Sequence, residues 1–172
     1  MIINTSENTE KIIKIKKKLE RILNVKIIVN DEGISLEGKP ENEYIAGKVI
    51  DAIQFGFRPP VALLIKSEDF LFEILNIKDY THRKDFGTIR ARIIGTGGKT
   101  LRTLSQLTEC FFEMNNNEVG IIGSPENMKK AQDAVISIVQ GAKQANVYSH
   151  LEKHQEKPIL DLGLKERKQK KE

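Results

Sequence analysis

The chain has 172 residues, 39% of them hydrophobic, and its 28 Lys and Arg against 24 Asp and Glu give a net charge of +4. This length suits one sizeable domain or two small ones, and the mild positive charge is compatible with nucleic-acid binding without proving it. No apolar run reaches the ~18 residues of a membrane span, no signal-peptide pattern opens the chain, and the single cysteine excludes an intramolecular disulfide, so we expect a cytoplasmic protein with no membrane partner.

The N-terminal part begins with a short predicted strand at residues 1–4, and a helix follows on which positive charge gathers. Residues 11–21 include six basic residues and one acid. Two interpretations of this segment stay open: a solvated helix face, or an auxiliary contact to RNA or protein. Basic residues also gather at 83–102, with six against one acid, and at 165–172, with five against two.

A pattern of turns and apolar residues occurs twice in the chain, at a spacing of 85 residues. The tripeptide Pro-Glu-Asn at 40–42 recurs at 125–127, and the same spacing relates Leu19 to Leu104, Ile22 to Leu107, Leu36 to Ile121, Gly38 to Gly123, Ala46 to Ala131, Ile53 to Ile138 and Gly56 to Gly141. Because these positions are mostly apolar or glycine, the core and the turns repeat. We predict two tandem copies of one fold at 1–60 and 61–155, and a charged, flexible tail at 156–172.

The junction between the copies is short and apolar. Gly56 is placed to end a helix, Pro59 and Pro60 prevent its continuation, and residues 61–65 resume an apolar run. A linker of this kind gives the two copies little freedom to separate. We therefore predict that they pack against each other.

The second copy shows a clear order of predicted elements. They are a strand at 70–77, a polar loop at 79–87, a helix at 88–94, a glycine-rich break, a helix at 101–108, a hairpin of strands at 110–114 and 119–122, a helix that begins at Ser124 and Pro125, and a further helix at 145–154. This order predicts an α+β fold in which a three-stranded sheet is backed by three helices. We expect the same architecture in the first copy.

The break between the two central helices of the second copy is the candidate functional site. Three of the four residues 95–98 are glycines, which lack the side chains that would keep a polyanion away from the backbone. The next helix begins there with free N–H groups and the positive end of its dipole, and Lys99 adds a full charge. These features favour binding of a nucleic-acid backbone, although the loop alone leaves open a glycine-rich turn without a ligand.

Three phosphate-binding patterns compete for these residues. A Walker loop fits Gly98, Lys99 and Thr100 but requires a glycine where Ile93 stands. A dinucleotide fingerprint finds Thr100 at its third glycine and no strand directly before it. The pattern that fits is Ile-Gly-x-x-Gly followed by Lys, the loop with which a K-homology (KH) domain holds about four nucleotides of a single strand.

The first copy lacks this loop. Glu10, Lys11, Ile12 and Ile13 stand at the positions that correspond to 95–98. Their side chains block a close approach of another backbone, and the carboxylate repels phosphate. We therefore predict that the first copy does not bind RNA at this site.

Candidate RNA-binding residues surround the glycine loop of the second copy. They are Arg90, Arg92, Ile93, Ile94, Gly95, Thr96, Gly97, Gly98, Lys99, Thr100, Arg102 and Phe112. The glycines offer backbone N–H groups, the four basic residues offer charge, and the threonines offer hydroxyl groups. Ile93 and Ile94 are expected to form an aliphatic floor under the bases unless they belong to the ordinary core, and the strand at 110–114 offers its backbone edge.

Two other classes of function compete with RNA binding. A nucleotide hydrolase or a nuclease would need carboxylates at metal-ligand spacing near the loop, and none stands there. His150 and His154 are one helical turn apart but have no third ligand, so we expect them on an exposed helix face. We predict no catalytic residue, no metal and no cofactor. A protein-docking scaffold in which both copies bind protein stays open.

Three segments together carry a resemblance to a known family: residues 91–100 around the glycine loop, 56–62 at the junction, and 147–151 after the repeat. The sequence resembles the archaeal KH-domain ribosomal RNA-processing proteins related to the small-subunit assembly factor Partner of Nob. The resemblance extends over nearly the whole chain apart from the tail. The sequence departs from the family at Ala91, where glycine is usual, and a helical position tolerates this change.

The resemblance implies two tandem type I KH domains, the first without its glycine loop, in an RNA-binding factor of ribosome biogenesis. It implies binding near the 3′ end of the small-subunit ribosomal RNA, together with two protein partners, the endonuclease that trims that end and the alpha subunit of initiation factor 2. We expect a monomer that is not an enzyme. The alternative is a general single-stranded RNA-binding adaptor related to the exosome or to translation.

Overall fold

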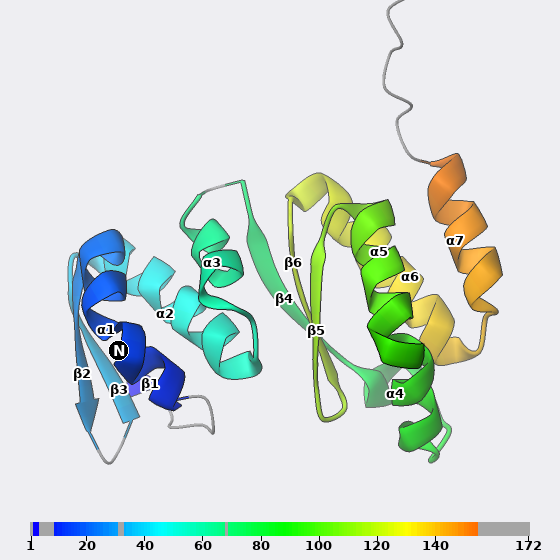
Figure 1. The fold of residues 1–172 in the computed structure, drawn as a ribbon, viewed down its shortest axis with the longest axis horizontal. Helices are drawn as coiled ribbons and strands as arrows, with labels where there is room; N and C mark the ends of the chain where they lie inside the picture. Colours follow the sequence, from blue (N-terminus) through cyan, green and yellow to red (C-terminus); the bar gives the residue numbers. More distant parts are fainter. Residues whose placement is uncertain (1, 4–8, 31–32, 68, 155–172) are drawn as a thin grey trace, which may run out of the picture.

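The computed structural model describes residues 2–3, 9–30, 33–67 and 69–154, which form two α/β units joined by a short junction (Figure 1). The first unit comprises β1 (Ile2–Ile3), α1 (Thr9–Leu23), β2 (Val25–Asn30), β3 (Gly33–Gly38) and α2 (Pro40–Phe55). The junction holds α3 (Pro59–Ala62) and the 3-10 turn η1 (Leu63–Lys66). The second unit comprises β4 (Leu71–Asn76), η2 (Ile77–Tyr80), α4 (Phe86–Ile94), η3 (Thr96–Gly98), α5 (Lys99–Thr108), β5 (Phe111–Asn115), β6 (Glu118–Gly123), α6 (Pro125–Gln140) and α7 (Gln144–Lys153).

Each unit is built on a three-stranded antiparallel sheet, with the strand orders β1-β3-β2 and β4-β6-β5. Figure 1 shows α1 and α2 beside the first sheet, and α5 and α6 beside the second. The buried apolar side chains form two clusters, one for each unit. The predicted mixed α/β fold is confirmed. Among the described residues, no helix has both the length and the apolar character that crossing a bilayer requires.

The repeat seen in the sequence reappears in the structure in the same register. Strand β6 and helix α6 begin and end 85 residues after β3 and α2. Both long helices end at a glycine with positive φ, 137° at Gly56 and 109° at Gly141. Before the strands that follow, Asn24 and Glu109 adopt nearly the same left-handed conformation, with φ of 57° and 55°. Turns and core positions therefore repeat together.

The first unit differs from the second at the positions that correspond to the glycine loop. Helix α1 runs without a break through residues 10–13, where the second unit has the corner between α4 and α5. Glu10, Lys11, Ile12 and Ile13 include no glycine or proline, and Ile12 is completely buried in the core, so nothing interrupts the helix. Most positions that correspond to α4 lie outside the described residues, so the predicted helix before this corner stays a prediction.

The two units pack against each other through aromatic side chains, as the short junction predicts. Phe55, Phe57 and Phe72 contact one another, with ring centroids 5.8 to 6.1 Å apart. They meet the second sheet at Gly120, where an added Cβ would lie 2.6 Å from Phe55 Cε1. The Asn115 side-chain amide donates a hydrogen bond to the Phe55 carbonyl at 3.2 Å.

The predicted boundary at residue 60 falls inside the junction. Ala62 is buried in the first core, and Val61, Leu63 and Ile65 pack against that core. The boundary between the copies stays a prediction. The predicted tail at 156–172 lies outside the described residues.

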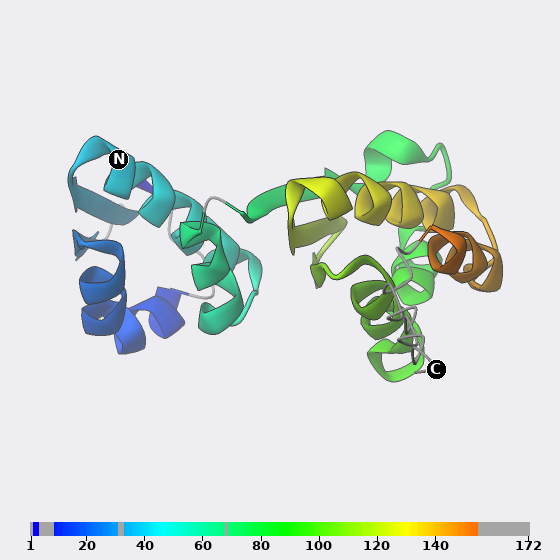
Figure 2. The same cartoon turned by 90° about the horizontal axis from the view of Figure 1, so that it is seen from above.

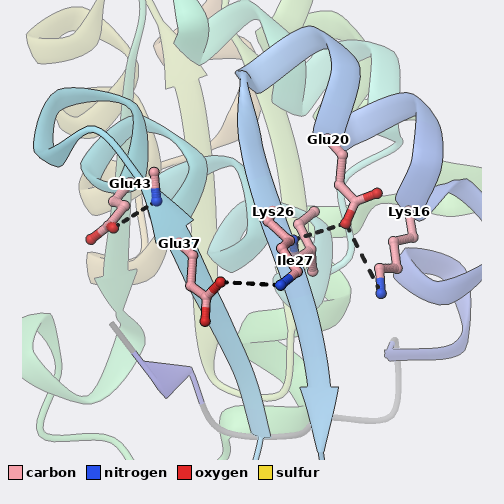
Figure 3. A network of polar contacts seen from close by, with 7 residues as sticks. Lys16, Glu20, Lys26, Ile27, Glu37 and Glu43 are labelled. Atoms are coloured by element: carbon pink, nitrogen blue, oxygen red, sulfur yellow. Dashed lines mark hydrogen bonds and ion pairs between the residues drawn. The ribbon is translucent and has the colours of Figure 1, made fainter.

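Polar contacts attach α1 to the strands of the first unit (Figure 3). The Glu20 carboxylate accepts a hydrogen bond from the Ile27 backbone N–H at 2.9 Å and lies 4.0 Å from the Lys16 ammonium group. On the neighbouring strands, Lys26 and Glu37 form an ion pair at 3.4 Å. Glu20 thus ties α1 to β2, whereas Lys26 and Glu37 pair at exposed positions of the strands.

Candidate nucleic-acid interface

The glycine loop forms a tight corner between α4 and α5. Helix α4 ends at Ile94, and Gly95 follows with φ of 72° and ψ of 170°. Gly97 and Gly98 adopt φ of 57° and 76°, in the left-handed region that favours glycine. Helix α5 begins immediately afterwards at Lys99, so the first N–H groups of α5 lie at this corner.

The glycines of the corner have different surroundings. A Cβ on Gly95 would lie 2.2 Å from Thr100 Oγ1 and 2.7 Å from Thr100 N, so only glycine fits there. A Cβ on Gly97 would meet only the Arg102 guanidinium, at 3.9 Å, and one on Gly98 would meet nothing within 4 Å. Gly95 therefore shapes the corner, whereas the backbone at Gly97 and Gly98 is open to an approaching chain.

Exposed polar side chains surround this open backbone. Thr96, Lys99 and Arg102 are all exposed. The Arg102 guanidinium donates a hydrogen bond to the Gly97 carbonyl at 2.6 Å, so its charge lies against the loop. The N–H groups of Gly98 and Lys99 donate to the Gly95 and Thr96 carbonyls inside the loop. The attraction for an anion therefore comes from the positive end of the α5 dipole and from the two neighbouring cations.

Four of the predicted contact residues lie partly or wholly inside the unit. Ile93 is completely buried and Phe112 is 9% exposed, and both belong to the core of the second unit. Thr100 is only 4% exposed, whereas Ile94 is half-buried beside the loop. The apolar surface available next to the loop is therefore provided by Ile94 rather than by Ile93.

The arginines of α4 make internal hydrogen bonds. Arg90 donates to the Asn117 side-chain oxygen at 2.7 Å, and Arg92 donates to the Ala142 carbonyl at 2.6 Å. Both side chains are half-buried. These contacts attach α4 to the β5–β6 turn and to the connection between α6 and α7. A role of these arginines as direct RNA contacts stays a prediction.

Gln144, the first residue of α7, joins the two helices that flank the loop. Its side-chain amide donates to the Arg92 carbonyl at 2.8 Å and to Thr100 Oγ1 at 3.0 Å. The Thr100 hydroxyl is therefore engaged inside the unit. No motif or spacing in the sequence points to Gln144, because its partners are 52 and 44 positions away.

Strand β5 lies at the edge of its sheet. It pairs with β6 from Phe111 opposite Ile122 to Asn115 opposite Glu118, and no described strand pairs with its other side. The unpaired N–H and C=O groups of such an edge can donate and accept further hydrogen bonds.

The described residues contain no cluster of three or more side chains suited to hold a metal ion. His150 and His154 are exposed at the end of α7, with ring centroids 4.4 Å apart, as predicted for an exposed helix face. The arrangement around the loop is suited to binding an anion.

Comparison with known proteins assigns the second unit to a domain family. A family model described as the eukaryotic type KH-domain (KH-domain type I) matches residues 71–156. A KH domain-containing protein of Methanocaldococcus jannaschii is 29% identical over 150 residues, which cover 83% of this chain and 66% of that protein. The pre-rRNA-processing protein pno1 of Schizosaccharomyces pombe is 29% identical over 105 residues, which cover 59% of this chain and 44% of that protein. The chain thus spans about half to two thirds of the length of these relatives.

A solved structure shares the arrangement of both units. In the a/eIF2alpha-aDim2p-rRNA complex from Pyrococcus horikoshii, a chain with 26% sequence identity superimposes with a TM-score of 0.74. The match covers 81% of each chain. The fold of this protein therefore also occurs in a chain crystallised with ribosomal RNA.

Proposed function

We propose a function from the premise that this chain belongs to the eukaryotic-type KH-domain family (KH-domain type I). The protein binds single-stranded RNA of the small ribosomal subunit near its 3′ end, through the glycine loop of the second unit, and acts in pre-rRNA processing. The observation that carries this proposal is the open backbone at Gly97 and Gly98, where an added Cβ would meet no atom closer than 3.9 Å.

The geometry at the loop suits a sugar-phosphate backbone. Phosphate oxygens would lie at the positive end of the α5 dipole, while Lys99 and Arg102 neutralise their charge. The bases would then lie over Ile94 towards the free edge of β5. Since each neutralised phosphate releases counterions, the affinity should fall steeply with salt, with a log–log slope of about −0.7 for each phosphate contacted.

The names of the similar proteins support ribosomal RNA as the ligand and pre-rRNA processing as the context. One relative is a pre-rRNA-processing protein, and one structural neighbour is a complex that contains ribosomal RNA and the alpha subunit of initiation factor 2. We extend both partners to this chain. The endonuclease that trims the 3′ end is a further expected partner, on the family resemblance alone.

In this proposal the first unit is the N-terminal KH domain of a tandem pair. Its strand order and its 85-residue register match those of the second unit. It does not bind RNA at the equivalent corner, because α1 is continuous there and Ile12 is buried. The protein acts as a monomeric binding factor in the cytoplasm, without catalysis.

The test replaces Thr96 and Gly97 by Asp and, as a matched control, by Asn. Asp and Asn have nearly the same size and both tolerate the left-handed conformation, so the two variants differ mainly in charge. Fluorescence anisotropy would measure binding to a labelled single strand with the 3′-terminal sequence of the small-subunit ribosomal RNA. We expect the Asp pair to lose about a hundredfold in affinity and the Asn pair to lose much less.

An Asp variant that stays folded and binds RNA as tightly as the Asn variant would remove the glycine loop from the function. A scrambled strand of the same length tests the position on the ribosomal RNA. Equal affinity for both strands would favour the general RNA-binding adaptor.

A further inference from the structure

The outer edge of β4 is free in the second sheet. This strand pairs with β6 on one side, from Leu71 opposite Gly123 to Asn76 opposite Glu118, and no described strand pairs with its other side. Proteins often protect such an edge with lysine or proline, because its unpaired N–H and C=O groups can join another chain. Residues 71–76 include neither, and their only charged residue is Glu73. The edge can therefore accept a further strand.

Exposed apolar side chains gather beside this edge. Five large hydrophobic side chains are exposed among the described residues, and three of them are Tyr44, Leu71 and Ile74, with exposed fractions of 64%, 41% and 46%. These three line a groove between α2 of the first unit and β4 of the second, together with Ile45, Ile65, Phe70 and Phe72. Single exposed apolar residues are common on protein surfaces, but a group of them on one face is typical of an interaction site.

The groove continues the contact between the two units, on the side of the molecule away from the glycine loop. Phe72, which lines the groove, contacts the rings of Phe55 and Phe57. Glu73 of β4 accepts a hydrogen bond from Gln132 of α6, so β4 and α6 are neighbours. Viewed from above, α2 and α6 lie on one side of the molecule, and α1 and α5 lie on the other (Figure 2). The groove and the glycine loop can therefore be occupied at the same time.

The charged residues that line the groove balance one another. They are two cations, Lys48 and Lys66, and two carboxylates, Asp51 and Glu73. Burial raises the pKa of Asp51, and the charge of Lys48 acts in the opposite direction. A groove of this composition has no electrostatic preference for the phosphate backbone of RNA. We therefore expect its occupant to be a protein.

We propose that this groove binds an extended segment of another protein, which adds a fourth strand to the second sheet at β4. Backbone hydrogen bonds to the free edge hold the segment, and apolar side chains at every second position enter the groove. The six residues of β4 span about 20 Å, at ~3.3 Å per residue. This edge fits one short strand, whereas a stable dimer of two copies would bury roughly 1,200 Å² or more in total. A second copy of this chain is therefore the less suitable occupant.

The experiment selects probe peptides and then measures their affinities. Random peptides displayed on phage are selected on the immobilised full chain, and the enriched sequences are synthesised with a fluorescent label. Anisotropy gives their affinity for the wild-type protein, for Ile74→Lys and for the matched control Ile13→Lys. Ile13 is an isoleucine of α1 with a similar exposed fraction, 52%, and α1 lies on the other side of the molecule from α2 and α6. Urea unfolding confirms that both variants are folded.

We expect the enriched peptides to carry β-branched or aromatic residues at alternate positions. Ile74→Lys should weaken their binding by about tenfold or more, because it places a charge in the apolar groove, and Ile13→Lys should change it by less than about twofold.

Two series of peptides, N-methylated at alternate residues, distinguish strand addition from simple apolar contact on the wild-type protein. Only every second N–H of an added strand faces β4, so one series should lose binding and the other should keep it.

Three results would overturn the inference. The first is that no enriched peptide depends on Ile74. The second is an equal effect of both methylated series, which would exclude strand addition. The third is a dimer in light scattering that Ile74→Lys converts to a monomer, because the groove would then belong to a second copy. None of these measurements involves RNA, so the inference and the proposed function can fail separately.

Discussion

The same corner of one fold has opposite forms in the two units. In the second unit, three glycines with positive φ separate α4 from α5 and leave the backbone open. In the first unit, α1 runs through the corresponding positions and buries Ile12. The strands and the final helices of both units nevertheless keep one register. The repeated core therefore does not determine binding, because four residues at one corner decide whether a polyanion can approach.

The difference also affects stability. Each glycine in the corner costs roughly 0.5–1 kcal/mol relative to alanine in a regular helix, because its unfolded state is more flexible. The first unit avoids this cost and gains the burial of Ile12, worth about 1.5–3 kcal/mol. The second unit thus gives up stability at the corner where its backbone is open.

The largest expected effect is that of Gly95→Ala, which would break the corner of the second unit. The new Cβ would collide with Thr100 Oγ1 in a left-handed conformation, so we expect a loss of roughly 2–4 kcal/mol and the loss of RNA binding. Urea unfolding would measure the stability. Gly98→Ala is the control, because its φ is also positive but open space surrounds the Cβ and its ψ of 16° places it in the αL region, which L residues tolerate better. Equal losses in the two variants would contradict a steric role of Thr100.

Ile12→Ala tests the corresponding position of the first unit. This change leaves a cavity in the first core, so we expect it to cost about 2–5 kcal/mol. Under conditions in which the variant is folded, its affinity for a short RNA strand should equal that of the wild-type protein. A large loss of short-strand affinity in the folded variant would mean that the first unit also binds RNA at this corner.

Gln144→Ala tests how firmly the corner is held. The change removes two hydrogen bonds to the flanking helices, so we expect a loss of about 1–2 kcal/mol and a several-fold weaker binding of RNA. Asn146→Ala, at an exposed position of the same helix, is the control. Unfolding curves and anisotropy titrations of both variants provide the measurements. Unchanged RNA affinity in Gln144→Ala would show that the loop keeps its shape without this side chain.

The smallest expected effect is that of Glu113→Gln, where the two units meet. Burial raises the pKa of the Glu113 carboxyl, although a backbone hydrogen bond at Met114 and the charges of Lys11 and Arg58 act in the opposite direction. Above this raised pKa the ionised carboxylate is less favourable in the folded state than in the unfolded state. We therefore expect Glu113→Gln to increase the free energy of unfolding at neutral pH, and the increase to disappear as the pH falls below the unfolded pKa. A gain that persists in acid would have another cause.

Local patterns were sufficient to predict much of the fold. The end of α2 at Gly56, the start of α6 at Pro125 and the corner at the glycine loop depend on residues that restrict the backbone where they stand. The continuity of α1 was also visible in the sequence, because no helix breaker occurs at Glu10 or its next three neighbours.

The orientation of side chains at the site could not be predicted in the same way. Arg90 and Arg92 are cations beside the loop in the sequence, but their guanidinium groups contact Asn117 and Ala142. Side chains alternate between the two faces of a strand, and that of Phe112 lies on the face that packs into the core. Such directions depend on contacts between distant segments, which no local spacing reports.

Gly120 has a consequence for the relative position of the two units. Because this position of the sheet has no side chain, Phe55 and Phe57 pack directly on the backbone, and the distance between the units is set by aromatic rings rather than by a loose tether. The two units should therefore move as one body rather than as two independently tethered domains.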